Sequence, residues 1–108
     1  MVWSKQVKNN IDSVKLHQKL SYISLGRGGY VIYQDDKGEI KFDYEFGGGD
    51  CVAIIFVPEP NHWHKQTGRN ESERLQILTF VAQQAIRDKA PGCRYEISDK
   101  FIELVNSH

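Results

Sequence analysis

Alternation between apolar and polar residues over positions 39–46 constrains the fold of this chain most strongly. Every second side chain there is apolar, namely those of Ile40, Phe42, Tyr44 and Phe46. The intervening positions are charged, namely Lys41, Asp43 and Glu45. Successive side chains of an extended strand point to opposite faces. The pattern therefore predicts a strand in a sheet with one buried face and one solvated face.

Short strands are also predicted on both sides of this segment, over residues 21–25, 30–34, 51–58, 94–98 and 101–105. The turn Asp36-Lys37-Gly38 joins two of them into a hairpin over residues 30–46, because glycine accepts the positive φ that tight turns need. The 51–58 strand is apolar on both faces, which favours a central place in the sheet. Pro58 ends it, because proline cannot donate a ladder hydrogen bond.

A helix is predicted over residues 70–89, where the apolar positions follow helical spacing: Leu75, Leu78, Val81, Ala82, Ala85 and Ile86. Asn70 with Glu73 three residues later resembles a capping box, and Pro91-Gly92 stops the helix. A second amphipathic helix is predicted over residues 4–20, with its apolar stripe formed by Trp3, Val7, Ile11 and Val14. Residues 58–69, which hold two histidines, are predicted to form a loop.

These elements follow the order α-β-β-β-β-α-β-β. The hairpins favour an antiparallel sheet of five to six strands, and the two amphipathic helices are expected to pack on one face of it. This is an α+β fold. The 108 residues fit one domain, residues 1–108, and we find no linker or internal repeat.

Charge and cysteine content limit the classes of function. Lys and Arg together number 14, as do Asp and Glu, so the basic excess of a typical nucleic-acid-binding protein is missing. Residues 34–50 are locally acidic, with six acidic residues against two lysines. The start of the sequence has no signal-peptide pattern, and no apolar run is long enough to span a membrane. Cys51 and Cys93 are too far apart for a zinc knuckle, so we expect a reducing, cytoplasmic setting; in an oxidising compartment the two could still pair.

The segment His62-Trp63-His64 is the candidate for chemistry. In an extended chain, residues two apart point the same way, so the two imidazoles could share a metal ion. Either ring could also act as a general base, with Glu59 to orient it. A zinc site needs three or four ligands, and no further histidine, cysteine or carboxylate has a diagnostic spacing. The alternative is a solvated loop in which Trp63 packs inward and the histidines point outward.

The sequence favours a non-catalytic protein that binds or neutralises another protein through its acidic hairpin and sheet face. The expected binding residues are Tyr33, Lys41, Asp43, Glu45 and Trp63, and the expected partner is a basic protein. No cofactor, membrane or nucleic acid is expected, and a homodimer stays open. The alternative function is a small metal-dependent or histidine-dependent hydrolase that uses the loop containing His62 and His64.

Overall fold

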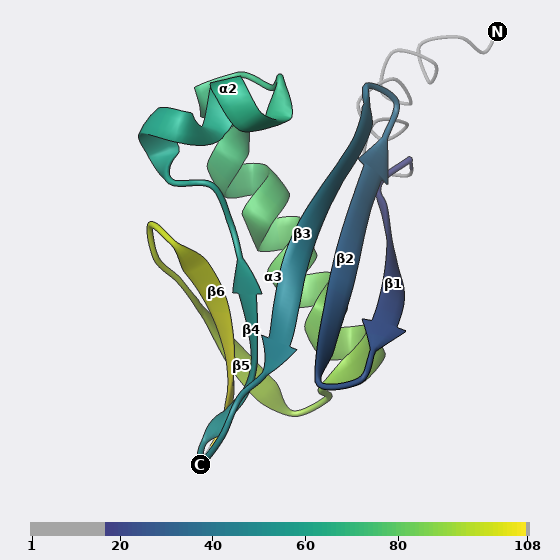
Figure 1. The fold of residues 1–108 in the computed structure, drawn as a ribbon, viewed down its shortest axis with the longest axis vertical. Coiled ribbons are helices and arrows are strands. Elements are labelled where there is room, and N and C mark those ends of the chain that lie inside the picture. The colour runs from purple at the N-terminus through teal and green to yellow at the C-terminus, as the bar shows by residue number, and fades with distance from the viewer. Residues whose placement is uncertain (1–16, 108) are drawn as a thin grey trace, which may run out of the picture.

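The structure, a computed structural model, describes residues 17–107. Within this range six strands form one antiparallel sheet in the order β1-β2-β3-β4-β6-β5 (Figure 1). The strands are β1 (Lys19–Leu25), β2 (Gly28–Asp35), β3 (Gly38–Phe46), β4 (Cys51–Phe56), β5 (Cys93–Ile97) and β6 (Phe101–Asn106). The predicted hairpin over residues 30–46 is confirmed by the β2–β3 ladder, which pairs Asp35 with Gly38 at the turn.

The long helix α3 (Arg74–Lys89) lies across one face of the sheet (Figure 1). It follows a 3-10 turn, η2 (Glu71–Glu73), and the predicted capping box is present: the Asn70 amide donates to the Glu73 carboxylate over 3.1 Å. The helix buries Ile77, Leu78, Val81, Ala82 and Ala85 against the sheet.

The predicted apolar stripe of this helix is wrong at one position, Leu75. Leu75 is 63% exposed, and Ile77 is buried instead. At about 100° per residue, the five buried side chains centre on a direction about 90° away from Leu75. Leu75 therefore lies at the margin of the stripe, in the first turn of α3.

The core lies between the sheet and α3. Val31, Tyr33, Ile40 and Phe42 supply it from β2 and β3, and Ala53, Ile55, Ile102 and Leu104 supply it from β4 and β6. The central place of β4 is confirmed, because it pairs with β3 on one side and β6 on the other. Fully burying a large apolar side chain stabilises the fold by about 1.5–3 kcal/mol, so this layer supplies most of the folding energy.

The α+β class, the antiparallel sheet and its packing against helices are confirmed (Figure 1). The loop prediction for residues 58–69 is wrong, because this segment forms η1 (Pro60–His62) and the short helix α2 (Trp63–Thr67). Proline at the first position of η1 and Gly68 in the left-handed conformation after α2 are favourable helix ends.

The predicted helix over residues 4–20 lies almost entirely outside the described residues. Its last two residues, Lys19 and Leu20, belong to β1, where they pair with Gln34 and Tyr33 of β2. None of the helices within residues 17–107 is both long and apolar enough to cross a lipid bilayer.

Candidate functional site

The two candidate histidines do not converge. His62 ends η1 and His64 lies in α2, so both are in helical backbone and not in the extended chain that the sequence interpretation assumed. Residues two apart in a helix point about 160° apart, which is nearly to opposite sides. The His64 Nδ1–H donates to the backbone oxygen of Arg69 over 3.1 Å. In the part of the chain that the structure describes, no group of three or more His, Cys, Asp or Glu residues could hold a metal ion.

Trp63 and Glu59 make structural hydrogen bonds in this segment and do not form a catalytic or metal site with the histidines. Trp63 is fully buried, and its indole N–H donates to the Asn70 backbone oxygen over 2.9 Å. The backbone oxygen of Glu59 accepts a hydrogen bond from the amide of His62, which starts η1. Trp63 was expected to bind a partner from the surface. Its burial instead makes it the anchor that holds α2 on the core.

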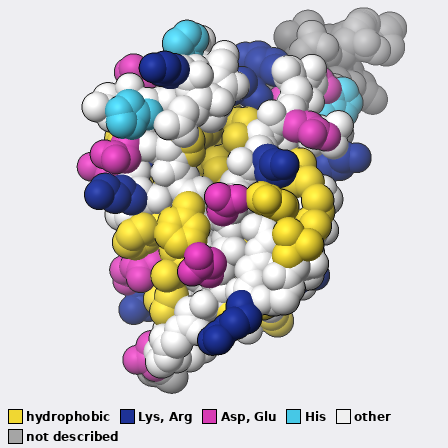
Figure 2. Space-filling model, viewed as in Figure 1, with side chains coloured by type: hydrophobic (Ala, Val, Ile, Leu, Met, Phe, Trp, Pro, Cys, Tyr) yellow, Lys and Arg dark blue, Asp and Glu magenta, His cyan; other side chains and the backbone are white. Residues whose placement is uncertain are grey.

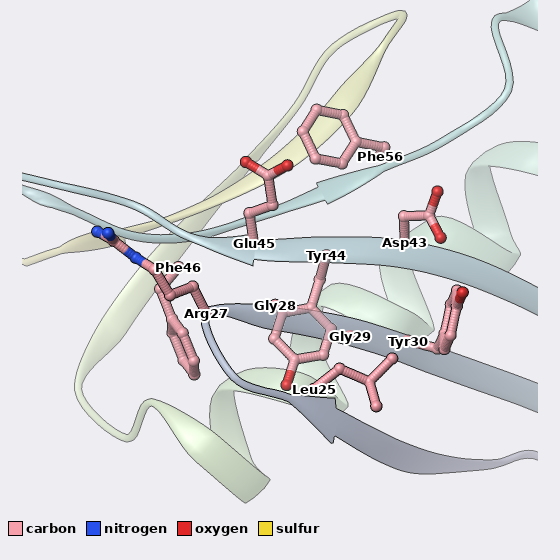
Figure 3. A pocket seen from close by; sticks show the side chains of 10 residues that line it. All are labelled: Leu25, Arg27, Gly28, Gly29, Tyr30, Asp43, Tyr44, Glu45, Phe46 and Phe56. Carbon is pink, nitrogen blue, oxygen red and sulfur yellow. The ribbon is translucent and has the colours of Figure 1, made fainter.

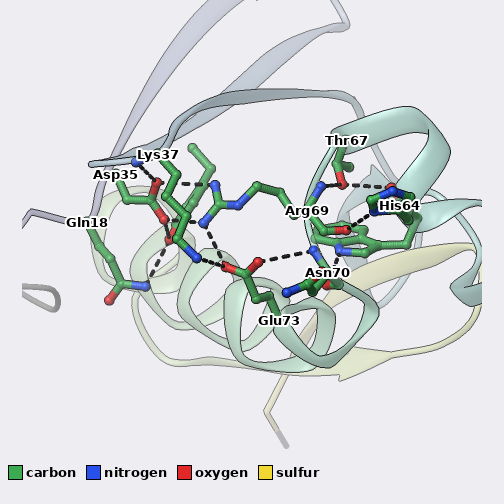
Figure 4. Close-up of polar contacts among 10 residues, drawn as sticks. Gln18, Asp35, Lys37, His64, Thr67, Arg69, Asn70 and Glu73 are labelled. Carbon is green, nitrogen blue, oxygen red and sulfur yellow. Dashed lines mark hydrogen bonds and ion pairs between the residues drawn. The ribbon is translucent and has the colours of Figure 1, made fainter.

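A buried arginine ties this segment to the β2–β3 hairpin (Figure 4). The side chain of Arg69 is 8% exposed, and its Nη1 and Nη2 donate to the two Asp35 carboxylate oxygens over 3.1 and 2.7 Å. Nη2 also donates to Glu73 over 2.9 Å. Tyr33 donates its hydroxyl proton to Asp35, and Gln18 donates to Tyr33. The cluster joins β2, the chain after α2 and the start of α3.

The charges of this cluster are held in their ionised forms. Burial opposes ionisation of Asp35, but hydrogen bonds from Arg69, Tyr33 and the Lys37 amide outweigh it and lower the Asp35 pKa. The hydrogen bond from Arg69 lowers the pKa of Glu73 in the same way. Burial raises the pKa of Tyr33 to about 12. Because each carboxylate is already satisfied by Arg69, we interpret the cluster as a structural clamp.

The opposite face of the sheet is uncovered: no helix among residues 17–107 packs on it (Figure 1). We call it the open face. Its large apolar side chains come from four strands and are Ile23, Leu25, Tyr30, Ile32, Ile54, Phe56, Phe101 and Val105. Its charged side chains include Lys41, Asp43 and Glu45 on β3, Glu103 on β6, and Arg94 and Glu96 on the edge strand β5. Figure 2 shows two apolar patches on this face, with acidic and basic side chains between them.

Three large apolar side chains of the open face are exposed. Leu25 is 61%, Ile23 43% and Phe56 39% exposed. Single exposed apolar residues are ordinary on protein surfaces, whereas grouped ones mark interaction sites. The three lie on β1 and β4, on either side of the charged row of β3.

A shallow hollow of about 720 Å³ lies in the open face (Figure 3). Gly28 forms its floor, because β2 has no side chain there to fill the space between Leu25 of β1 and Glu45 of β3. Asp43 and Phe56 lie along the same rim, and Arg27 extends from the far end, away from Asp43 (Figure 3). A side chain at position 28 would meet the Tyr44 backbone oxygen at 2.4 Å, so the close strand pairing requires glycine.

Three carboxylates of the open face, two of them lining the hollow, are not neutralised. Asp43, Glu45 and Glu103 form no hydrogen bond or ion pair with any residue between 17 and 107. Lys41 lies over the Tyr30 ring, 4.5 Å from its centroid, and so contacts an aromatic face instead of a neighbouring acid. The surface is thus apolar with unpaired negative charge.

Three of the five predicted binding residues lie on the open face and two do not. Lys41, Asp43 and Glu45 are exposed there. Tyr33 is 1% exposed and pairs with Ile40 on the covered face, so its expected placement beside the outward charges is wrong. Val31, which precedes Tyr33 on the same side of β2, pairs with Phe42 on the covered face as well. The reason is register: odd-numbered residues of β2 oppose even-numbered residues of β3.

A second, smaller hollow lies on the covered side. It encloses about 300 Å³ between the end of α3 and the sheet, and most of its lining is apolar, including Ala53, Ala85 and Ala90. Tyr44 and Ser24 share a hydrogen bond of 3.3 Å at its edge. Most of its lining residues belong to the core, so we interpret this hollow as loose packing at the end of α3.

Several residues of the open face could not be located from local patterns. Phe56 and Glu103 lie on neighbouring strands because β4 pairs with β6, although the whole of α3 separates them in the sequence. One signal was available: the 51–58 segment is apolar on both faces, although a two-layer fold covers only one.

This chain matches no protein-family model, no curated protein and no solved structure.

Proposed function

We propose that the protein is a non-catalytic binding module whose open face docks a basic protein. The observation that carries this proposal is the combination of exposed Ile23, Leu25 and Phe56 with the unpaired carboxylates Asp43, Glu45 and Glu103. Apolar side chains supply affinity on burial, and unpaired charge selects the partner and speeds its association.

Charge complementarity supports a basic occupant. Docking a lysine or arginine beside Asp43 and Glu45 would satisfy carboxylates that have no partner within residues 17–107. Like charges directly opposite each other destabilise a sheet, and Glu96 and Glu103 are such a cross-strand pair. A basic partner would relieve this repulsion. The hollow at Gly28 gives a protruding side chain of the partner a place to insert.

The hydrolase alternative has less support. The rings of His62 and His64 diverge, and the His64 Nδ1 already contacts a backbone oxygen. A catalytic pair would need both groups within hydrogen-bond reach of one substrate. The proposal also places the protein in a reducing compartment such as the cytoplasm, where Cys51 and Cys93 would stay free thiols as the structure has them.

Site-specific photocross-linking in the cells that make the protein tests the proposal. A photoreactive amino acid at position 56 would lie on the open face, and one at position 75 would lie on an exposed apolar site of α3 as the matched control. We expect a discrete cross-linked protein with a basic surface from position 56 and not from position 75. Equal cross-linking from both positions, or an acidic captured protein, would contradict the proposal.

A further inference from the structure

The outer edge of the sheet at β5 carries a self-complementary charge pattern. Arg94 and Glu96 both lie on the open face, on either side of Tyr95, and their side chains are each 56% exposed. They form an ion pair with each other along the strand. An identical strand running antiparallel, with the two Tyr95 residues opposite, would place each Arg94 across from the Glu96 of the other copy.

The backbone N–H and C=O groups of β5 that do not bond to β6 lie at the residues that this register would pair. The Ser98 amide donates to the Phe101 oxygen over 2.9 Å, so residues 98 and 101 form a hydrogen-bonded pair of the β5–β6 ladder. Such pairs recur at every second residue of an antiparallel ladder, at Glu96 and Arg94. The backbone groups of Tyr95 and Ile97 therefore point away from β6, toward the outer edge.

The two observations agree on one arrangement. With Tyr95 at the centre, the two Tyr95 residues exchange their outward N–H and C=O groups, and each Ile97 amide reaches the Cys93 oxygen of the other copy. The Cys93 amide already donates to the Ala90 oxygen over 3.1 Å, so each Ile97–Cys93 pair keeps only one of the two hydrogen bonds of a full ladder pair. The charged pairs then fall at the positions between hydrogen-bonded pairs, where opposing side chains are closest.

The edge is also accessible. No strand among residues 17–107 pairs with the outer side of β5, and the first described residue, His17, precedes β1 at the opposite edge of the sheet. A hollow of about 440 Å³, lined by Gln83 and Arg87 of α3 and by Arg94 and Tyr95 of β5, leaves room beside the strand.

We propose that two copies of this chain pair through β5 into one continuous antiparallel sheet. The two-fold axis is perpendicular to the sheet, so both open faces lie on the same side. A partner with two basic sites could then bind both copies at once, which raises its apparent affinity. This pairing does not depend on the proposed function, because it requires no third protein.

Sedimentation velocity of the purified full chain over a concentration series tests the pairing. Because a five-residue edge is a small interface, we expect a weak dimer with a Kd in the roughly micromolar to submillimolar range. Arg94→Glu and Glu96→Arg each place like charges opposite each other twice, and each is expected to weaken the dimer about tenfold. The double variant Arg94→Glu with Glu96→Arg restores the opposite charges and should return the Kd to the wild-type value.

Control variants separate this edge from others and from misfolding. Ser21→Glu changes an exposed residue of β1, at the other edge of the sheet, and should leave the Kd unchanged. Circular dichroism melts confirm that each variant is folded. The pairing is overturned if the wild type stays monomeric throughout the series, if Ser21→Glu and not Arg94→Glu breaks the dimer, or if the folded double variant fails to restore it.

Discussion

Arg69 and Asp35, 34 residues apart in the sequence, form a bidentate ion pair with N–O distances of 3.1 and 2.7 Å. Both side chains are at least nine-tenths buried. Through this pair the end of β2 fixes the chain that enters α3, so the turn of the β2–β3 hairpin and the α2 segment are held as one unit (Figure 4). The pair therefore supports the end of the sheet where β3 carries Lys41.

Replacing Arg69 with Met should destabilise the protein by about 3–5 kcal/mol, because Asp35 would remain as a buried charge without its partner. Urea denaturation measures this loss. Arg94→Met, measured at a protein concentration at which the chain is monomeric, is the matched control: its ion pair is more than half exposed, and we expect a change below about 1 kcal/mol. Equal effects of the two substitutions would show that the Arg69 cluster is not the clamp described above.

Acid should weaken the fold through Asp35 and Glu73. Both pKa values are lowered in the folded state from the ordinary values of 3.8 and 4.5. Their contribution to stability is therefore complete above these ordinary values and is lost as the pH falls through the lowered, folded-state values. Urea midpoints measured between about pH 6 and about pH 3 should fall for the wild type. The variant Asp35→Asn with Glu73→Gln should lose less over the same range, and an identical loss would refute this assignment.

Gly28 should tolerate no side chain. A Cβ there would meet the Tyr44 oxygen at 2.4 Å, which forces the β2–β3 ladder apart. We expect Gly28→Ala to destabilise the protein by about 1–3 kcal/mol, as overpacking does. At Gly48 nothing lies within 4 Å of the added Cβ, so Gly48→Ala should change the unfolding free energy by less than about 0.5 kcal/mol. Thermal melts of the two variants, recorded side by side, would contradict this if their midpoints agreed.

Local patterns in the sequence predicted the elements well. Alternation at Ile40 and Phe42 located β3 and its buried side, and helical spacing from Leu78 to Ala85 located α3. These signals are local because the periods of two and 3.6 residues arise within a single element. The segment from Pro60 to Thr67 was missed because its helices are only three and five residues long, too short to show a period.

The candidate site depends on register, which local patterns do not specify. Tyr33 was assigned to the wrong face because its neighbours on β3 were not known, and a shift of one residue reverses every side chain. Glu103 joins Asp43 and Glu45 on the open face only through the β4–β6 pairing. Arg69 could not be recognised as buried, because its partner Asp35 lies 34 residues earlier, at the end of β2.

The affinity of the protein cross-linked from position 56, purified and measured at low and high salt, tests the central claim most directly. We expect Asp43→Lys with Glu45→Lys to weaken binding roughly tenfold or more, and added salt to weaken wild-type binding, because the docked charges are complementary. The double variant Glu71→Lys with Asp99→Lys makes the same change in net charge away from the open face, at exposed positions, and should bind as the wild type does. An unchanged Kd for the Asp43 and Glu45 variant would contradict the claim that the open face binds a basic protein.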